Sequence, residues 1–210
     1  MDPHAGQPIE SAGAPLGQSR AAVIMIHGRG ASPGNILELA PALGHPELTY
    51  LAPSAAGSTW YPFSFLADIQ TNEPFLSSAL GVIDRLVAGL LVKGIARERI
   101  LLLGFSQGAC LASEFAVRHP ARYGGVVAFS GGLIGPPGTV WDEDKGRFEG
   151  TPVFLGCSDV DPHIPKARVD DSAGVFNRMG AEVTKRIYPS MGHLVNDDEI
   201  AFARSLIDGW

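Results

Sequence analysis

The chain has 210 residues, of which 45% are apolar and 18% are charged, and its formal net charge is −6. This size suits one compact domain with its own core, and the negative charge argues against a nucleic acid or an anionic membrane surface as a partner. The N-terminus lacks the basic start and apolar centre of a secretory signal, and the apolar runs stop short of about 18 residues, so we expect neither secretion nor stable membrane insertion.

Residues 1–20 are rich in Gly, Ala, Pro and Ser, and we interpret them as a lead-in with one weak edge strand near residues 8–11. Residues 21–210 are predicted to form a single domain in which short apolar runs alternate with segments of helical period. In chain order the predicted elements are a strand at 21–27, a helix at 32–43, a strand at 48–53, a helix at 72–94, a strand at 99–105, a helix at 107–119, strands at 123–130 and 151–157, a helix at 165–180, a strand at 181–189 and a helix at 197–210. This alternation predicts an α/β fold with a mostly parallel sheet and helices on both faces.

Chemically reactive side chains follow four of the predicted strands. His27 ends the first long strand, Ser106 follows the third, Asp159 and Asp161 follow the strand at 151–157, and His193 follows the last strand. Because the carboxyl ends of parallel strands meet at one edge of the sheet, we expect these side chains to gather there.

Ser106 lies in the sequence Gly-Phe-Ser-Gln-Gly, residues 104–108, between a strand and a helix. In this context Gly-x-Ser-x-Gly is typical of a nucleophile elbow, a sharp turn that exposes the serine hydroxyl and aims the first N–H groups of the helix at its target. A serine in an ordinary tight turn is the alternative. The elbow predicts Ser106 as a catalytic nucleophile.

A serine nucleophile needs a general base, and the base needs an orienting carboxylate. His193 follows the last strand in the order Ser, Asp, His, and we predict it as the base. Asp159 and Asp161 both follow the strand at 151–157, and from the residues alone either one could be the acid while the other stabilises a turn.

The oxyanion formed during acyl transfer needs two N–H donors. We expect one from the backbone of Gln107, directly after the nucleophile, and the other from the backbone of Arg29 in the loop His27–Gly30. The Arg29 side chain is interpreted as solvated, and His27 as a structural hydrogen-bonding residue.

Aromatic residues are concentrated between the second strand and the long helix, in the segment 58–75. Trp60 and Phe63 are predicted to bind substrate near the serine, whereas Tyr61 and Phe65 are interpreted as structural. The segment is too short for a large lid, which argues against an interfacial lipase.

Five stretches together resemble the phospholipase/carboxylesterase family of small α/β-hydrolases, which includes bacterial carboxylesterases and acyl-protein thioesterases that also act as lysophospholipases. They are IHGRG (26–30), APS (52–54) with WYPF (60–63), GFSQGA (104–109), DPHIP (161–165) and MGH (191–193). The resemblance implies an α/β-hydrolase fold, Ser106 as nucleophile, Asp161 as acid, His193 as base, no metal or other cofactor, and frequent homodimers. One departure is that LGCSDVD (155–161) replaces the family's usual His-Gly before the acid, which keeps Asp159 as an alternative.

These features predict a serine carboxylesterase that hydrolyses small to medium acyl esters, with a small-molecule ester as its partner. A lysophospholipase or acyl-protein thioesterase is the alternative within the same chemistry, and a non-catalytic binding protein with this fold is an alternative of another class. Cys110 and Cys157 suggest no disulfide framework, so we expect a reduced, cytoplasmic setting.

Overall fold

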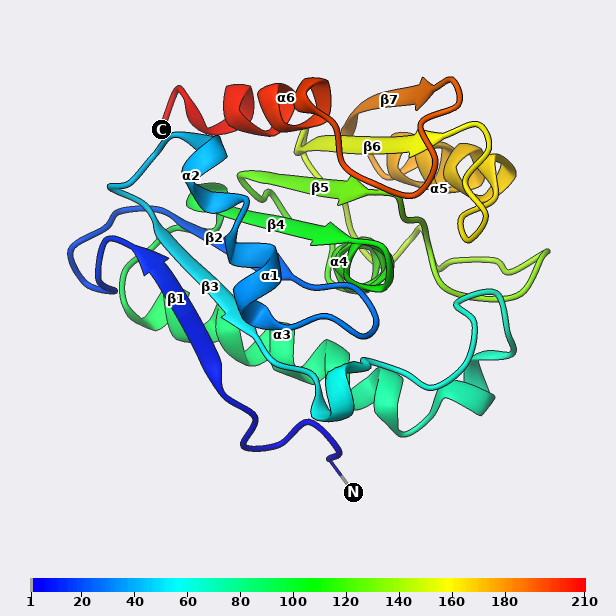
Figure 1. The fold of residues 1–210 in the computed structure, drawn as a ribbon, viewed down its shortest axis with the longest axis horizontal. Coiled ribbons are helices and arrows are strands. Elements are labelled where there is room, and N and C mark those ends of the chain that lie inside the picture. Colours follow the sequence, from blue (N-terminus) through cyan, green and yellow to red (C-terminus); the bar gives the residue numbers. More distant parts are fainter. Residues whose placement is uncertain (1) are drawn as a thin grey trace.

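A computed structural model describes residues 2–210 of the chain. Seven strands form one sheet in the order β1-β3-β2-β4-β5-β6-β7 (Figure 1). The strands are β1 (Ile9–Gly13), β2 (Ala22–Ile26), β3 (Thr49–Pro53), β4 (Ile100–Phe105), β5 (Gly125–Phe129), β6 (Pro152–Ser158) and β7 (Glu182–Tyr188). All pairs are parallel except β1 with β3. The predicted α/β architecture is confirmed.

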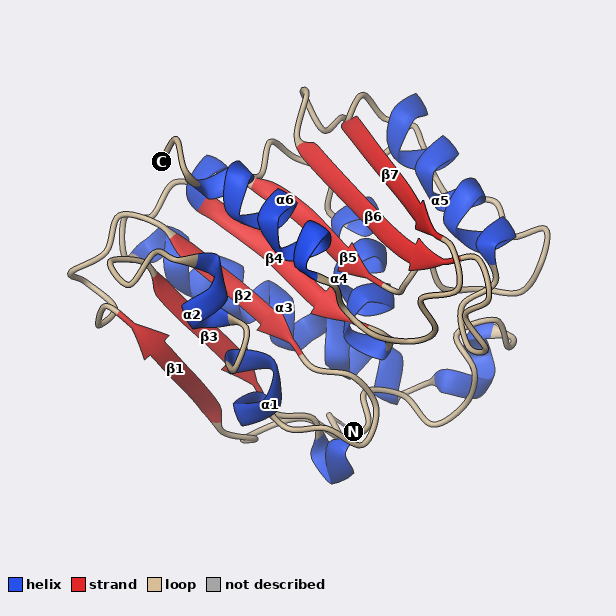
Figure 2. Ribbon diagram, turned by 45° about the horizontal axis from the view of Figure 1, so that its top comes forward, coloured by secondary structure: helices blue, strands red, loops and turns tan. Residues whose placement is uncertain are grey.

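Helices cover both faces of the sheet (Figure 2). They are α1 (Pro33–Leu37), α2 (Ala40–Leu43), α3 (Phe75–Val92), α4 (Gln107–Arg118), α5 (Lys166–Arg178) and α6 (Asp197–Ile207). One core layer packs α3, α4 and α5 against the sheet, and the other packs α1, α2 and α6 against the opposite face. Every residue of β2, β3 and β5 is buried, which explains why these strands are continuous apolar runs without alternation.

The lead-in does contain an edge strand. β1 pairs antiparallel with β3 from Ile9 opposite Pro53 to Gly13 opposite Thr49. Ahead of it, His4 is 1% exposed and packs near α3, where its backbone N–H donates to the Ser78 hydroxyl at 2.9 Å. This N-terminal segment is therefore fixed to the rest of the molecule.

The helix predicted over residues 32–43 is wrong in its continuity, because it is divided into α1 and α2. Ser32 caps α1 in a capping box with Asn35. Pro41 has no N–H to donate to the carbonyl of Leu37, and its ring would meet that carbonyl in a continuous helix, so the chain bends between the two helices.

Helix α3 is long and apolar enough to match a membrane span, with 18 residues and a mean hydropathy of 1.8. The sequence count missed it because Asp84 and Arg85 interrupt the apolar run. Half of the helix is buried inside the molecule, and Leu76, Ile83 and Leu90 pack in the core beneath the sheet. This inward face is that of an amphipathic core helix.

Candidate active site

The turn between β4 and α4 places Ser106 at its apex with φ 56° and ψ −120°. Such a positive φ is rare for a residue with a side chain. Gly104 and Gly108 make the turn possible, since a Cβ at Gly104 would lie 2.3 Å from the Gly108 carbonyl oxygen and one at Gly108 would lie 2.1 Å from that of Ile26. The two glycines therefore allow α4 to pass directly against β2 and β4.

The loop after β7 brings His193 to this serine. Nε2 of His193 lies 2.8 Å from the Ser106 hydroxyl, and Nδ1 lies 2.7 Å from Oδ2 of Asp161 in the loop after β6. A carboxylate only accepts hydrogen bonds, so Nδ1 carries the proton and Nε2 is free to accept from the serine. This is the arrangement of a serine, a base and an orienting acid.

The structure places Asp161, and not Asp159, against His193. The second oxygen of Asp161, Oδ1, accepts the backbone N–H groups of His163 and Ile164 at 2.8 and 3.0 Å. Asp159 lies at the surface, where its carboxylate accepts the N–H of Ser190 at 2.8 Å. Asp159 thus joins the two loops that carry Asp161 and His193.

The Asp161 carboxyl is held in its charged form. Burial raises its pKa, but the hydrogen bonds from His193 and from the two backbone N–H groups outweigh burial, and the pKa lies below its ordinary value. The Cys157 thiol is also within 3.7 Å of Oδ2, and burial raises the pKa of this thiol to about 12, so it stays protonated.

The two predicted oxyanion donors line the same cavity as Ser106. Within residues 2–210, the backbone N–H groups of Arg29 and Gln107 have no protein acceptor. Gly30 donates to the Ser58 carbonyl at 2.7 Å and so fixes the bend beside Arg29. Both N–H groups are therefore available to a bound oxyanion.

Arg29 is exposed, as expected, but its side chain also bonds within the protein. Its guanidinium donates to the carbonyl oxygens of Tyr61, Pro62 and Phe63 at 2.8, 2.9 and 2.8 Å. A planar guanidinium with several donors suits three successive carbonyls on one loop. The side chain therefore stabilises the cavity wall.

The Gln107 side chain has a structural role that the sequence did not reveal. Its Oε1 accepts the N–H of Trp60 at 2.9 Å, and its Nε2 donates to the carbonyl of Tyr61 at 2.8 Å. Gln107, which follows Ser106, is thereby joined to the aromatic segment at Trp60 and at Tyr61.

The prediction that Trp60 binds substrate is wrong. Trp60 is 0% exposed and does not line the cavity. Its indole N–H donates to the His27 carbonyl at 2.9 Å, and its ring lies between those of His4 and His27, at 5.4 and 5.0 Å. A buried indole needs a partner for its N–H, and the loop meets this need by turning Trp60 into the core.

The aromatic walls of the cavity come from other residues of the segment. Phe63 lines it as predicted and is 56% exposed, but Tyr61 and Phe65, interpreted as structural, line it too. The cavity has a volume of about 570 Å³. Its further lining includes Cys110 of α4 and Ile164, with His163 close to the base at a ring distance of 4.8 Å from His193. Its walls are thus mainly apolar around a few polar groups, as in small-molecule sites.

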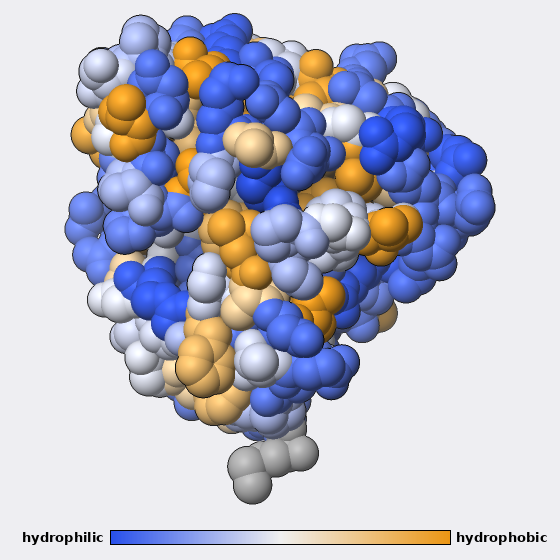
Figure 3. All heavy atoms as spheres, turned by 90° about the vertical axis from the view of Figure 1, so that its right-hand side faces the viewer, coloured by the Kyte–Doolittle hydropathy of each residue, from blue (hydrophilic) through white to orange (hydrophobic). Residues whose placement is uncertain are grey.

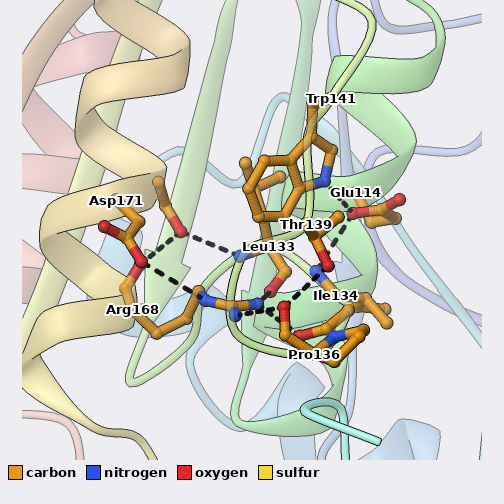
Figure 4. A network of polar contacts seen from close by, with 10 residues as sticks. Glu114, Leu133, Ile134, Pro136, Thr139, Trp141, Arg168 and Asp171 are labelled. Atoms are coloured by element: carbon orange, nitrogen blue, oxygen red, sulfur yellow. Dashed lines mark hydrogen bonds and ion pairs between the residues drawn. The ribbon is translucent and has the colours of Figure 1, made fainter. Parts of the chain in front are cut away.

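A buried polar network joins Arg168 and Glu114 to the segment 133–136 (Figure 4). Arg168 of α5 donates to three carbonyl oxygens of the segment 133–136 at 2.7, 2.8 and 3.2 Å. Glu114 of α4 accepts the N–H of Ile134 at 3.0 Å. The same segment donates from Gly135 to the Phe65 carbonyl at 2.8 Å, so the network holds the cavity wall from behind.

His27 is structural, as interpreted. Its Nδ1 donates to the Gly28 carbonyl at 2.8 Å and its Nε2 accepts the N–H of Ala55 at 3.2 Å, while burial lowers its pKa. Among residues 2–210, no three His, Cys, Asp or Glu side chains lie close enough together to hold a metal ion.

Comparison with known proteins identifies the family of this chain. The phospholipase/carboxylesterase family matches residues 8–210. The chain belongs to this family. The predicted α/β-hydrolase fold and the predicted hydrolase of carboxylesterase/phospholipase type are thereby confirmed.

Several family relatives are similar over different parts of the chain. A crystal structure of a phospholipase/carboxylesterase from Dyadobacter fermentans is 38% identical, covers 99% of both chains and superposes with a TM-score of 0.93. Acyl-protein thioesterase 1 from Saccharomyces cerevisiae is 34% identical over 139 residues, which are 65% of this chain and 60% of the yeast protein. Lysophospholipase-like protein 1 from Mus musculus is 24% identical over 92% of this chain and 88% of its own length. The family is therefore shared, while the named activities differ among its members.

Proposed function

We propose that this chain is a serine carboxylesterase that hydrolyses small to medium acyl esters through an acyl-serine intermediate. The observation that carries the proposal is the pair of contacts made by His193, at 2.8 Å to Ser106 and 2.7 Å to Asp161. The setting beside an apolar cavity supports a small-molecule ester as the substrate.

In the proposed reaction the Ser106 hydroxyl attacks the ester carbonyl while Nε2 of His193 takes its proton. The carbonyl oxygen becomes an oxyanion and accepts the backbone N–H groups of Arg29 and Gln107. His193 then gives its proton to the departing alkoxide, which leaves as an alcohol. A water molecule then gives a proton to the same histidine and attacks the acyl-serine. As the bond to Ser106 breaks, His193 returns this proton to the serine oxygen and the carboxylic acid leaves. Asp161 keeps its charge throughout and stabilises the imidazolium.

Lysophospholipase and acyl-protein thioesterase activities are the second candidates, because relatives of this chain carry those names. Both would form the same acyl-serine, so only the leaving group separates them from an esterase. We further propose a cytoplasmic setting, since Cys110 and Cys157 are both buried free thiols. Homodimer formation stays a prediction.

The test uses a fluorophosphonate probe and the Ser106→Ala variant. We expect the probe to label the wild type at Ser106, and we expect Ser106→Ala to lose labelling and about 10⁴-fold or more in turnover of p-nitrophenyl esters. Parallel assays with acyl thioesters and lysophosphatidylcholine rank the three activities. An unlabelled wild type, or a variant that still hydrolyses at the wild-type rate, would leave a non-catalytic binding protein as the better explanation.

A further inference from the structure

A second cavity, of about 400 Å³, adjoins the first at His193. Gly28, Ala31, Phe105 and His193 line both cavities, whereas Ser106 lines only the first, so the two meet at the histidine. The carboxyl-end face of the molecule, to which the parallel strands point, is seen in Figure 3, where apolar patches lie separated among polar side chains. The two cavities therefore offer neighbouring, mainly apolar surfaces to a bound molecule.

The walls of the second cavity are mainly apolar. Beyond the shared residues, they include Ile36 of α1, Leu39 between α1 and α2, and Leu194 and Val195 of the loop after β7. No Lys, Arg, Asp or Glu lies among the described residues that line it. A charged group placed there would lose water without gaining a partner, which is unfavourable.

The Asn35 side-chain oxygen and the His27 ring nitrogens of this cavity are engaged within the protein. Oδ1 of Asn35 accepts the N–H and the hydroxyl of Ser32 at 3.1 and 2.9 Å in the cap of α1. Both ring nitrogens of His27 are bonded to backbone groups. The chemistry of the cavity thus suits an uncharged, apolar ligand.

The position of His193 decides which part of an ester would enter the second cavity. Nε2 of His193 must reach the leaving oxygen in order to protonate it. Leu194 and Val195 follow His193 directly and line only the second cavity, whereas Gln107 and Cys110 of α4 line only the first. The leaving group is therefore directed along Leu194, and the acyl group toward α4.

We infer that the second cavity binds the leaving-group alcohol and selects esters of uncharged, apolar alcohols. This inference rests on the proposed esterase function. Burying one methylene group strengthens binding by about fourfold, so an alkyl chain partly covered by this cavity should gain roughly two- to fourfold per methylene. The esters favoured are those with apolar groups on both sides of the carbonyl.

The first test compares ethyl, butyl and hexyl acetate. Simple primary alcohols are similar leaving groups and all three esters form the same acetyl-serine, so differences in kcat/KM report binding of the alcohol. We expect kcat/KM to rise about tenfold or more from ethyl to hexyl acetate in the wild type. In Leu194→Asp this hexyl-to-ethyl ratio should fall to near one. Leu16→Ala is the control, because Leu16 is 44% exposed against 47% for Leu194 and lines neither cavity.

The second test separates the two cavities and the effect of charge. The ratio of kcat/KM for ethyl hexanoate to that for ethyl acetate should be the same in Leu194→Asp and the wild type, since the acyl group lies elsewhere. Acetylcholine and its uncharged isostere 3,3-dimethylbutyl acetate have leaving groups of equal shape, and the wild type should prefer the isostere by at least tenfold.

Three outcomes would overturn the inference while leaving the esterase intact. They are equal kcat/KM values for ethyl and hexyl acetate, an altered acyl ratio in Leu194→Asp, and a preference for acetylcholine. Absence of Ser106-dependent hydrolysis of every ester would instead overturn the proposed function and this inference together. Circular dichroism and melting curves of each variant exclude misfolding as the cause.

Discussion

Asp161 contacts His193 through one carboxylate oxygen only, because its other oxygen is held by two backbone N–H groups of its own loop. This division has a consequence for the Asp161→Asn variant. The amide oxygen of Asn would keep the two backbone donors, which would turn its NH₂ group toward Nδ1 of His193. Nδ1 would then have to accept, so the proton would move to Nε2 and the base could no longer accept from Ser106.

We therefore expect Asp161→Asn to lower kcat by about 10³ to 10⁴ with little change in KM. Asp159→Asn is the matched control, because Asp159 accepts only the N–H of Ser190 and does not contact His193. Steady-state kinetics on p-nitrophenyl acetate compare the two variants. A larger loss in Asp159→Asn would transfer the role of the acid to that residue.

Trp60→Ala should destabilise the whole molecule. The indole is fully buried, and its removal would leave a cavity and an unpaired carbonyl at His27. We expect the free energy of unfolding to fall by about 3–5 kcal/mol, with activity on all acyl chain lengths declining together. Urea unfolding monitored by circular dichroism measures this loss. If the variant were stable and lost activity only on esters with long acyl chains, Trp60 would instead bind substrate.

Phe63→Ala should have the opposite profile. The ring is 56% exposed and lines the cavity, so its truncation removes substrate contact without opening the core. We expect KM for medium-chain p-nitrophenyl esters to rise about fivefold, with kcat nearly constant and unfolding stability within about 0.5 kcal/mol of the wild type. Acetate esters should be less affected because they reach less of the ring. Equal effects on acetate and octanoate would contradict this role.

Glu199 predicts how stability depends on pH. Burial raises the pKa of Glu199 to about 7, against the hydrogen bond that it accepts from the Asn196 N–H, and Asp198 adds to the increase. The folded protein thus binds this proton more tightly than the unfolded chain does. Stability from this group is greatest below the ordinary carboxyl pKa, declines as the pH rises toward 7, and is fully lost above it.

We expect the wild type to lose on the order of 2–3 kcal/mol of unfolding free energy through this group between pH 5 and pH 8. Glu199→Gln cannot ionise and should show a flatter dependence over the same range. Asp197→Asn, which alters an exposed carboxyl in the same turn, is the control and should follow the wild type. Urea unfolding at intervals of one pH unit compares the three proteins, and parallel curves for wild type and Glu199→Gln would contradict the prediction.

The sequence alone predicted those parts of the site that depend on local pattern. Ser106 lies in a Gly-x-Ser-x-Gly sequence at a strand-to-helix junction, and His193 lies in the loop after the last strand. Both residues could therefore be located without knowing the order of strands in the sheet. Asp159 and Asp161 follow the same strand, and the choice between them depends on the turn that bonds Asp161 to its own loop. That turn does not follow from period or spacing, and only the resemblance at DPHIP (161–165) favoured Asp161.

The side-chain directions in the aromatic segment could not be predicted from the sequence. It has no regular period, so nothing in the sequence distinguishes the inward direction of Trp60 from the outward direction of Phe63. The path of this loop is set by distant partners, namely the Arg29 guanidinium and the Gln107 amide. Such contacts between residues far apart in the chain require the three-dimensional structure.

At Ser106 the backbone conformation that exposes the hydroxyl for hydrolysis also lowers the stability of the fold. A positive φ with a side chain present costs on the order of 1 kcal/mol or more, which glycine would avoid. Ser106→Gly should therefore relieve this backbone strain and lose as much hydrolysis as Ser106→Ala. A laboratory evolution experiment that rewards only heat resistance would be drawn toward that replacement, so every round of selection on this enzyme has to include a measurement of ester hydrolysis.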